Sequence, residues 1–274
     1  MDVQEIIRGG GFASFDGQVL RIDGTCVRPY AVTDTRKLSV EVAEGAEGRL
    51  VLLHAAPVEA EIRLALAEGA RLSVTEIFTA EAFVSLSVAE AAHSSCSLTM
   101  VQLASADLSF SAALDGREAG CDLRGVFLAS GKEHCRVFVR IGHNVPDCRS
   151  DSLVKGIAGG EAKGEFRGLV YVAPDAQRTD ARQQSRNIQL SRTARITTRP
   201  QLEIYADDVK CTHGATVGQM DADAIFYMRQ RGLSEAQARA LQIEGFVGDI
   251  VRRCDIEPLR EALTEAVAAK LERM

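Results

Sequence analysis

Short apolar runs alternate with small or acidic residues over most of the first two thirds of the chain. Within several of these runs polar and apolar side chains alternate, as they do in strands that bury one face. The clearest examples lie between about residues 38 and 172, at 50–53, 72–78, 83–88, 97–103, 123–128 and 136–141. The pattern predicts a structure made mainly of β-strands.

A weak internal repeat predicts how these strands stack. The sequence VAEGA at 42–46 recurs as LAEGA at 66–70, 24 residues later, and a degenerate copy, VAEAA at 88–92, follows after 22 more. Periods of this length are typical of a β-solenoid whose coils turn at small-residue corners. On the period alone, short hairpins in a β-sandwich remain an alternative.

After Gly218 the pattern changes to that of helices. Asp221 is placed to cap the first helix, and Gly232 to end it. Ser234 with Gln237 three residues later predicts a capping box at the start of a second helix. Its apolar positions are Ala238, Leu241, Ile243 and Phe246, leading toward Ile250, and Pro258 opens a third helix.

Composition narrows the classes of function. The chain has 274 residues, a net charge of −6 and no polybasic block, so nucleic acid is not an expected partner. No apolar run approaches the roughly 18 residues of a membrane span, and the first residues do not resemble a signal peptide. We therefore expect a cytoplasmic protein with no membrane partner.

The cysteines and the glycine motifs exclude further classes. Seven cysteines are scattered without a Cys-x-x-Cys pair, which argues against a disulfide framework and a zinc finger. The glycine run at 9–11 lacks the Lys-Ser/Thr ending of a phosphate-binding loop, so we expect this chain to bind no ATP. The sequence lacks a Ser/His/Asp order that would indicate a hydrolase, and we do not expect an enzyme.

Cys211 and His213 are the strongest candidates for chemistry. Residues i and i+2 of a strand point to one face, so a thiol and an imidazole here can address the same ligand. Both groups suit iron or an iron–sulfur cluster, yet two ligands do not complete a four-ligand site. The alternative is structural: a buried cysteine beside a hydrogen-bonded histidine at a subunit contact.

Two other polar groups have weaker claims. His143 and Cys148 flank a Pro146-Asp147 turn, and we interpret them as packing at a solenoid corner rather than as a metal loop. Asp207 and Asp208, with Glu203, suggest either paired carboxylates for catalysis or the solvated edge of an exposed strand that faces a partner.

Several motifs together resemble the SufB/SufD family of scaffold proteins for iron–sulfur cluster assembly, and within it the SufD type. The resemblance covers about half of the chain, from about residue 140 to 255. Its motifs are HNVPDCRS at 143–150, FRGLVYVAPDAQRTD at 166–180, SRNIQLS at 185–191, PQLEIYADDVKCTHGATVG at 200–218 and DADAIFYMRQRG at 221–232, and Gly245-Phe246 closes a helical stretch.

The resemblance implies a fold and a way of pairing. It implies a right-handed parallel β-helix over residues 1–218 and a small α-helical module over residues 219–274. An open solenoid end must be covered, and in this family a second scaffold subunit covers it, so strands within 188–209 would join an intermolecular sheet. The residues expected at that interface are Glu203, Tyr205, Asp207 and Asp208.

The resemblance also implies a function without catalysis. The chain would pair with a SufB-like subunit, and His213 would lie where a transient iron–sulfur cluster or iron is assembled, with Cys211 as a second candidate ligand. SufB carries two cysteines and a glutamate where this chain has Ser185, Ala194 and Gly214. The chain therefore resembles the supporting half of the pair.

The helical module has a role of its own in this family, where it docks the ATPase SufC. That role implies contacts through Phe226, Tyr227 and Arg231, although the same segment also fits a core helix with a charged outer face. ATP-driven closure of two ATPase subunits would then strain the scaffold interface and expose His213. The rival hypothesis is a stand-alone homodimer that binds a metal or cluster at two symmetric Cys211/His213 pairs.

Overall fold

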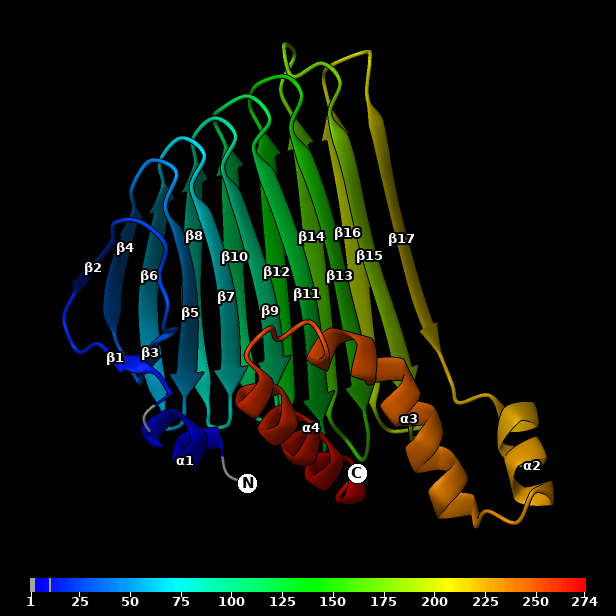
Figure 1. Cartoon of the computed structure of the whole chain (residues 1–274). Helices are drawn as coiled ribbons and strands as arrows, with labels where there is room; N and C mark the ends of the chain where they lie inside the picture. Colours follow the sequence, from blue (N-terminus) through cyan, green and yellow to red (C-terminus); the bar gives the residue numbers. More distant parts are fainter. Residues whose placement is uncertain (1–2, 10) are drawn as a thin grey trace.

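Two parallel β-sheets, packed face to face, form the body of the molecule in this computed structural model, which describes residues 3–9 and 11–274 (Figure 1). Strands alternate between the sheets along the chain, so each coil gives one strand to each sheet. This is a solenoid, and the expected β-helix class is confirmed. The β-sandwich of hairpins is wrong because every strand pair is parallel.

Sheet A holds the odd-numbered strands in sequence order: β1 (Ala13–Ser14), β3 (Tyr30–Thr33), β5 (Glu47–His54), β7 (Arg71–Phe78), β9 (Ser95–Gln102), β11 (Gly120–Ala129), β13 (Arg149–Ala158), β15 (Asp180–Gln189) and β17 (Lys210–Gly218). Sheet B holds the even-numbered strands: β2 (Val19–Ile22), β4 (Lys37–Val42), β6 (Val58–Leu66), β8 (Ala82–Glu90), β10 (Ala106–Leu114), β12 (His134–His143), β14 (Lys163–Val172) and β16 (Arg195–Ile204). The six predicted apolar runs lie within or overlap these strands.

The corners repeat as predicted, with one correction. Gly45 and Gly69 occupy matching corners with φ of 64° and 66°, a conformation that glycine adopts without strain. The third corner places His93 in the left-handed region, with φ of 58°. Leu66 pairs in register with Glu90, so the structural repeat is Glu90 to Ser94, and the predicted copy at 88–92 is wrong by two residues.

The space between the sheets is the main core, which we call the lumen. Side chains from both sheets fill it, including the fully buried Phe78, Phe110, Phe127 and Phe166. In the second half of β5, β7, β9, β11 and β13 of sheet A both faces are buried. Residues such as Ile77, Val101 and Leu128 point away from the lumen into a second apolar cluster under the helices.

The described residues also form four helices: α1 (Val3–Arg8), α2 (Ala222–Gln230), α3 (Glu235–Val251) and α4 (Glu257–Glu272). The predicted caps are confirmed: Asp221 accepts from the N–H groups of residues 223 and 224, and Ser234 forms a capping box with Gln237. The helix expected to close at Gly245-Phe246 instead continues to Val251, because Gly245 and Gly248 cost less than their apolar neighbours gain by packing.

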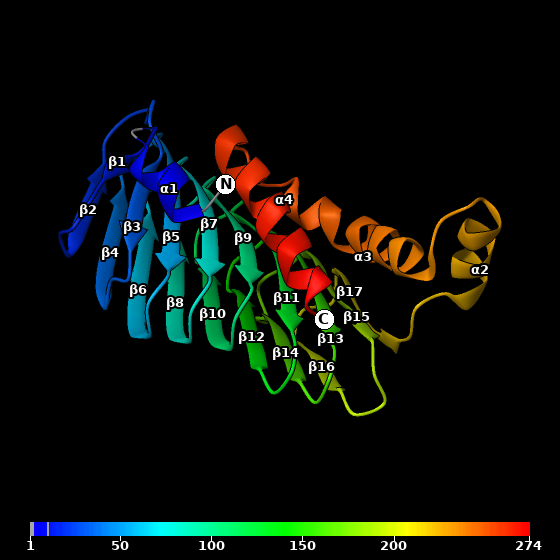
Figure 2. The ribbon, with the colours of Figure 1, turned by 90° about the horizontal axis from the view of Figure 1, so that it is seen from below.

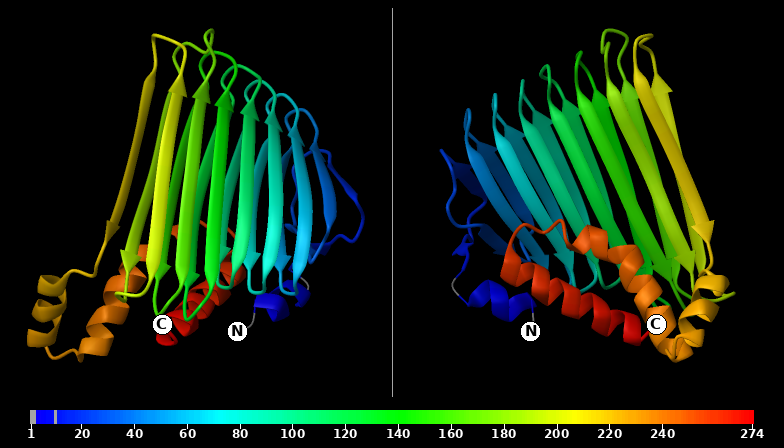
Figure 3. Two further views of the ribbon diagram at one scale, coloured as in Figure 1. Left: turned by 180° about the vertical axis from the view of Figure 1, so that it is seen from behind. Right: turned by 45° about the vertical axis from the view of Figure 1, so that its right-hand side comes forward.

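The helices α3 and α4 lie along the outer side of sheet A (Figure 2). Two ion pairs with buried lysines fasten them there. Lys155 of β13 donates to both oxygens of Asp249 at 2.7 and 2.8 Å, and Lys270 of α4 pairs with Glu133 at 2.6 Å. By contrast, α2 projects past the end of sheet A and buries none of its residues (Figures 1 and 3). None of the described helices is long and apolar enough to cross a membrane.

Candidate functional site at the open end

The solenoid ends at its C-terminal side in two strands that each pair on one side only. Strand β16 is the last of sheet B and β17 the last of sheet A (Figure 3). The expected interface range of 188–209 needs correction, because Ile188 belongs to β15, which pairs with both β13 and β17. The open edges are β16 and β17, and together we call them the open end.

Cys211 and His213 both lie on β17 and point to one face, as their spacing predicts. They pair in register with Ala181 and Gln183. Gln183 is fully buried, and its Oε1 lies 2.1 Å from where a Cβ of Gly168 in the opposite sheet would stand, so this face looks into the lumen. Cys211 and His213 are therefore among the lumen-facing residues of the last coil, and no further coil of the described chain lies above them.

The two side chains differ in exposure. His213 is exposed, whereas Cys211 is partly buried. Burial raises the pKa of the Cys211 thiol, against a smaller opposing effect of a hydrogen bond with the Ala181 backbone. The thiolate is the form that binds metals, so a metal at this position has to displace the thiol proton.

Polar side chains lie in the lumen directly below the last strand. Asn187 donates to the Ser185 hydroxyl at 2.9 Å and to the Thr216 carbonyl at 3.0 Å, which fixes β17 onto β15. Ser185 and Ala194 are fully buried, whereas Gly214 is exposed with open space around the position of a Cβ. These are the three positions where the resemblance expects SufB to differ.

The four residues predicted at the interface are all exposed at this end of the molecule. Glu203 is on β16, and Tyr205, Asp207 and Asp208 lie in or next to the corner between β16 and β17. The aspartates therefore occupy a turn, not the exposed strand that was expected. Tyr205 is 61% exposed although its ring lies 5.7 Å from that of Tyr171 in the coil below.

Sequence reasoning missed two apolar residues at the open end. Ile204 is 38% exposed and Val217 is 41% exposed. Both pair in register with residues below that face the lumen, so they are core positions that lack a covering coil. The signal was present in the alternation of β16 and β17, but only the strand order shows that nothing follows.

The three residues predicted on the helical module come together on α2. Phe226 and Tyr227 are 62% and 59% exposed. The Arg231 guanidinium lies 5.1 Å from the Tyr227 ring centre and donates to its hydroxyl at 2.7 Å. Leu241 of α3, expected on the apolar face, is instead 52% exposed. The core-helix alternative is not supported, because α2 has no buried residue.

His143 and Cys148 are structural, as interpreted from the sequence. Nε2 of the buried His143 lies 2.8 Å from the Ser150 hydroxyl, and burial lowers its pKa to about 4. The buried Cys148 thiol donates to the Gly116 carbonyl, and burial raises its pKa to about 11. In the described part of the chain, no group of three or more His, Cys, Asp or Glu side chains is placed to hold a metal ion.

The turn between them is an ionic corner. Asp147 takes a φ of 68° and pairs with Arg178 at 2.5 Å and with Arg117 at 2.6 Å, on the neighbouring coils. Hydrogen bonds from Arg178 and Arg117 hold the pKa of the Asp147 carboxyl well below its usual range. The corner links three coils and holds the Asp147 carboxylate between two guanidinium groups.

Comparisons with known proteins identify the family to which the chain belongs. Residues 30–246 match the family described as SUF system FeS cluster assembly, SufBD core domain. The iron-sulfur cluster assembly protein SufD of Escherichia coli is 34% identical over 161 residues, which are 59% of this chain and 38% of that protein. A SufBD family protein of Synechocystis is 39% identical over 143 residues, 52% of this chain and 32% of that protein.

A SufBD family protein of Mycobacterium leprae is 33% identical over 175 residues, 61% of this chain and 44% of that protein. The chain thus spans less than half of the length of these curated relatives. The family match covers the solenoid from β3 to β17 and extends into α3. The chain belongs to the SufBD family of the SUF system for iron–sulfur cluster assembly.

Proposed function

We propose that this chain is a non-catalytic scaffold subunit of an iron–sulfur cluster assembly complex, which pairs through its open end with a SufB-like subunit and docks a SufC-like ATPase on its helical module. The observation that carries the proposal is the open end itself. Two strand edges with unpaired backbone groups, and apolar residues such as Val217, are exposed there. Exposed edges of this kind favour addition of strands from another chain.

The transient cluster is the cargo of this interface. His213 is exposed at the open end and Cys211 lies two residues away on the same face, so the chain offers an imidazole and a thiol where the second subunit would sit. Within the described residues no third ligand of this type lies beside them. A partner chain would supply the remaining ligands of a four-ligand site.

The ATPase would dock on α2. Because α2 buries no residue and exposes two aromatic rings, packing within this chain stabilises it little. Aromatic and arginine side chains are common anchors in protein interfaces. The Arg231 side chain fixes the Tyr227 ring, so the two residues present one rigid surface. In the assembled pair the second subunit would cover His213, and ATP-driven closure of two such ATPase subunits would then strain the interface and expose this residue again.

Co-purification with SufB-like and SufC-like proteins tests the proposal. The wild type should form a stoichiometric complex with each. Val217→Glu places a charge in the open end and should abolish the SufB-like contact while keeping the SufC-like one. Phe226→Ala with Tyr227→Ala should do the reverse. Phe83→Glu, which changes a 47% exposed residue on the outer face of sheet B, is the matched control and should keep both. Failure of the wild type with both partners removes the proposal.

The alternative is a homodimer in which two copies pair by their open ends. The same exposed edges support it, because a twofold axis would bring two Cys211/His213 pairs together. Mass measurement of the chain alone, followed by anaerobic reconstitution with iron and sulfide, separates the two. A dimer that gains iron–sulfur absorbance, and loses it in His213→Ala, favours the alternative. A monomer without absorbance favours the heteromeric scaffold.

A further inference from the structure

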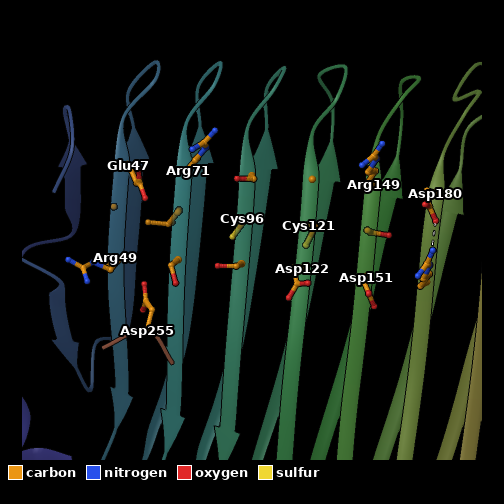
Figure 4. Close-up of a pocket in the computed structure, with 18 residues that line it drawn as sticks. Glu47, Arg49, Arg71, Cys96, Cys121, Asp122, Arg149, Asp151, Asp180 and Asp255 are labelled. Atoms are coloured by element: carbon orange, nitrogen blue, oxygen red, sulfur yellow. Dashed lines mark ion pairs between the residues drawn. The ribbon is translucent and has the colours of Figure 1, made fainter. Parts of the chain in front are cut away.

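A groove crosses the outer face of sheet A, on the side opposite the lumen. It has a volume of about 630 Å³ and runs over six strands from β5 to β15, with the connection between α3 and α4 as its lower wall (Figure 4). A volume of this size is typical of small-molecule sites and small for a docked protein segment. None of the residues proposed above for cluster assembly or docking lines it.

The centre of the groove has an open floor between two arginines. Arg71, Ser95, Gly120 and Arg149 follow one another in register on neighbouring strands. At about 4.8 Å per strand, the Cα atoms of Arg71 and Arg149 are about 14 Å apart. A Cβ on Gly120 would meet nothing closer than the Arg149 carbonyl oxygen at 4.0 Å, so no side chain fills the space between them.

The two arginines form no ion pair among the described residues, whereas the acids at the centre of the groove do. Among the described residues, neither Arg71 nor Arg149 has an ion pair or a side-chain hydrogen bond. Asp122 and Asp151 both pair with Arg124, at 3.1 and 2.9 Å. Arg253, from the lower wall, pairs with Asp122 at 2.6 Å as well. The charge left free at the centre is therefore positive.

The remaining acids of the groove lie at its two ends. Asp180, the register neighbour of Arg149, pairs with Arg182 at 3.6 Å, whereas two acids at the other end have no ion pair among the described residues. Glu47 is the register neighbour of Arg71, and Asp255 stands on the lower wall near β5 and β7 (Figure 4). They limit an anion to the stretch between the two arginines. There the backbone groups of the strands are already paired in the sheet, so recognition has to come from side chains. Ser95 and Ser97 line this stretch and carry hydroxyl donors.

We propose that this groove binds a small polyanion, with phosphate or carboxylate groups held between Arg71 and Arg149. Guanidinium groups match these anions by paired, charge-assisted hydrogen bonds. The serine hydroxyls add donors from the floor, and no aromatic ring lines the groove to select a base.

Calorimetric titration of the chain alone tests this inference, with tripolyphosphate and citrate as probes and sodium chloride at equal ionic strength as the blank. We expect a single site, and the tighter probe identifies the preferred group. Arg71→Gln and Arg149→Gln should each weaken binding at least about tenfold, as the loss of a charge-assisted hydrogen bond does. Arg140→Gln removes an exposed, equally unpaired arginine from the outer face of sheet B, and should stay within about twofold.

A second variant blocks the floor without touching a charge. Gly120→Val places a side chain in the open space, where it suits a strand, so melting temperature should be retained while binding is lost. Heats equal to the salt blank in the wild type overturn the proposal. So does equal weakening by Arg140→Gln, which means that the anion binds by net charge alone. Because no partner protein is used, the result is independent of the scaffold assignment.

Discussion

Glu90 is an acidic residue at a position where the two neighbouring strands have leucines. It pairs with Leu66 and Leu114 on the neighbouring strands and is 1% exposed in the lumen. Burial raises its pKa to about 9 from an ordinary value of 4.5, and the backbone of Gly120 and Cys96 opposes only part of the shift. In the folded state the side chain is therefore a neutral acid at neutral pH.

Replacing Glu90 should stabilise the chain, increasingly so as pH rises. Between pH 4.5 and 9 the folded state holds a proton that the unfolded state has lost, so the free energy of unfolding falls as pH rises. At pH 7 the buried, protonated Glu90 lowers the free energy of unfolding by on the order of 3 kcal/mol, at about 1.4 kcal/mol per pH unit. Glu90→Leu should remove that slope, which urea unfolding at pH 5, 7 and 8.5 measures.

Glu90→Gln is the control, since it also removes the titration but keeps a polar group in the lumen. It should flatten the pH profile and be less stable than Glu90→Leu. His143 has the opposite effect on the pH profile. Burial lowers its pKa to about 4 in the folded state, so between pH 6.5 and 4 the unfolded state takes up a proton that the folded state does not, and the free energy of unfolding falls as pH falls. A Glu90→Leu variant that is less stable than the wild type at pH 8.5 would contradict this account.

At the scale of elements, the sequence predicted those strands and helix caps that depend on residues close together in the chain. Polar and apolar alternation identified strands such as β7 and β12, because one face of each lies against the lumen. The caps at Asp221 and Ser234 follow from side chains that reach backbone groups two or three residues away. The pair Cys211 and His213 falls on one face for the same local reason.

What the sequence left undetermined depends on pairing between distant segments. The left-handed corner residue passes from glycine to His93 in the third coil, and only the register of Leu66 with Glu90 reveals it. The exposed Val217 reads as a core residue until β17 is known to be the last strand. The groove between Arg71 and Arg149 joins residues that lie 78 positions apart in the sequence, which no local pattern marks.

Glycines inside strands make room for side chains from other coils. A Cβ at Gly156 of β13 would stand 2.1 Å from Phe127 and 2.4 Å from Asn187 Oδ1, both buried. Gly156→Ala should therefore destabilise the chain by about 1 to 3 kcal/mol, as overpacking of a core does. Gly120→Ala on β11 is the matched control, because its Cβ meets open space. Equal midpoints of thermal unfolding for the two variants would refute this packing argument.

At the scale of the whole molecule, the helices α3 and α4 are part of the core. Residues of α3 and α4 such as Val247 and Leu263 share one buried cluster with Val51 and Ile77 of sheet A. Lys155 and Lys270, both with side chains 7% exposed, form ion pairs across this contact. The N-terminal helix α1 contributes Val3 to the same cluster, so both ends of the chain meet there.

A chain that ends at Gly218 should therefore not behave as a free solenoid. The truncation would uncover the outward side chains of Val51, Leu53, Ile77, Val101, Val126, Leu128 and Ile157, which are at most 1% exposed in the whole chain. An apolar patch of this extent favours association and binding of apolar dyes. We expect oligomers by light scattering and enhanced fluorescence of the dye ANS. The control keeps the helices but replaces Phe226 and Tyr227 by serine, which uncovers nothing and should leave both readouts unchanged. A monomeric, dye-free truncation would show instead that the helices are an appendage, and that the two ion pairs hold a module the sheets do not need.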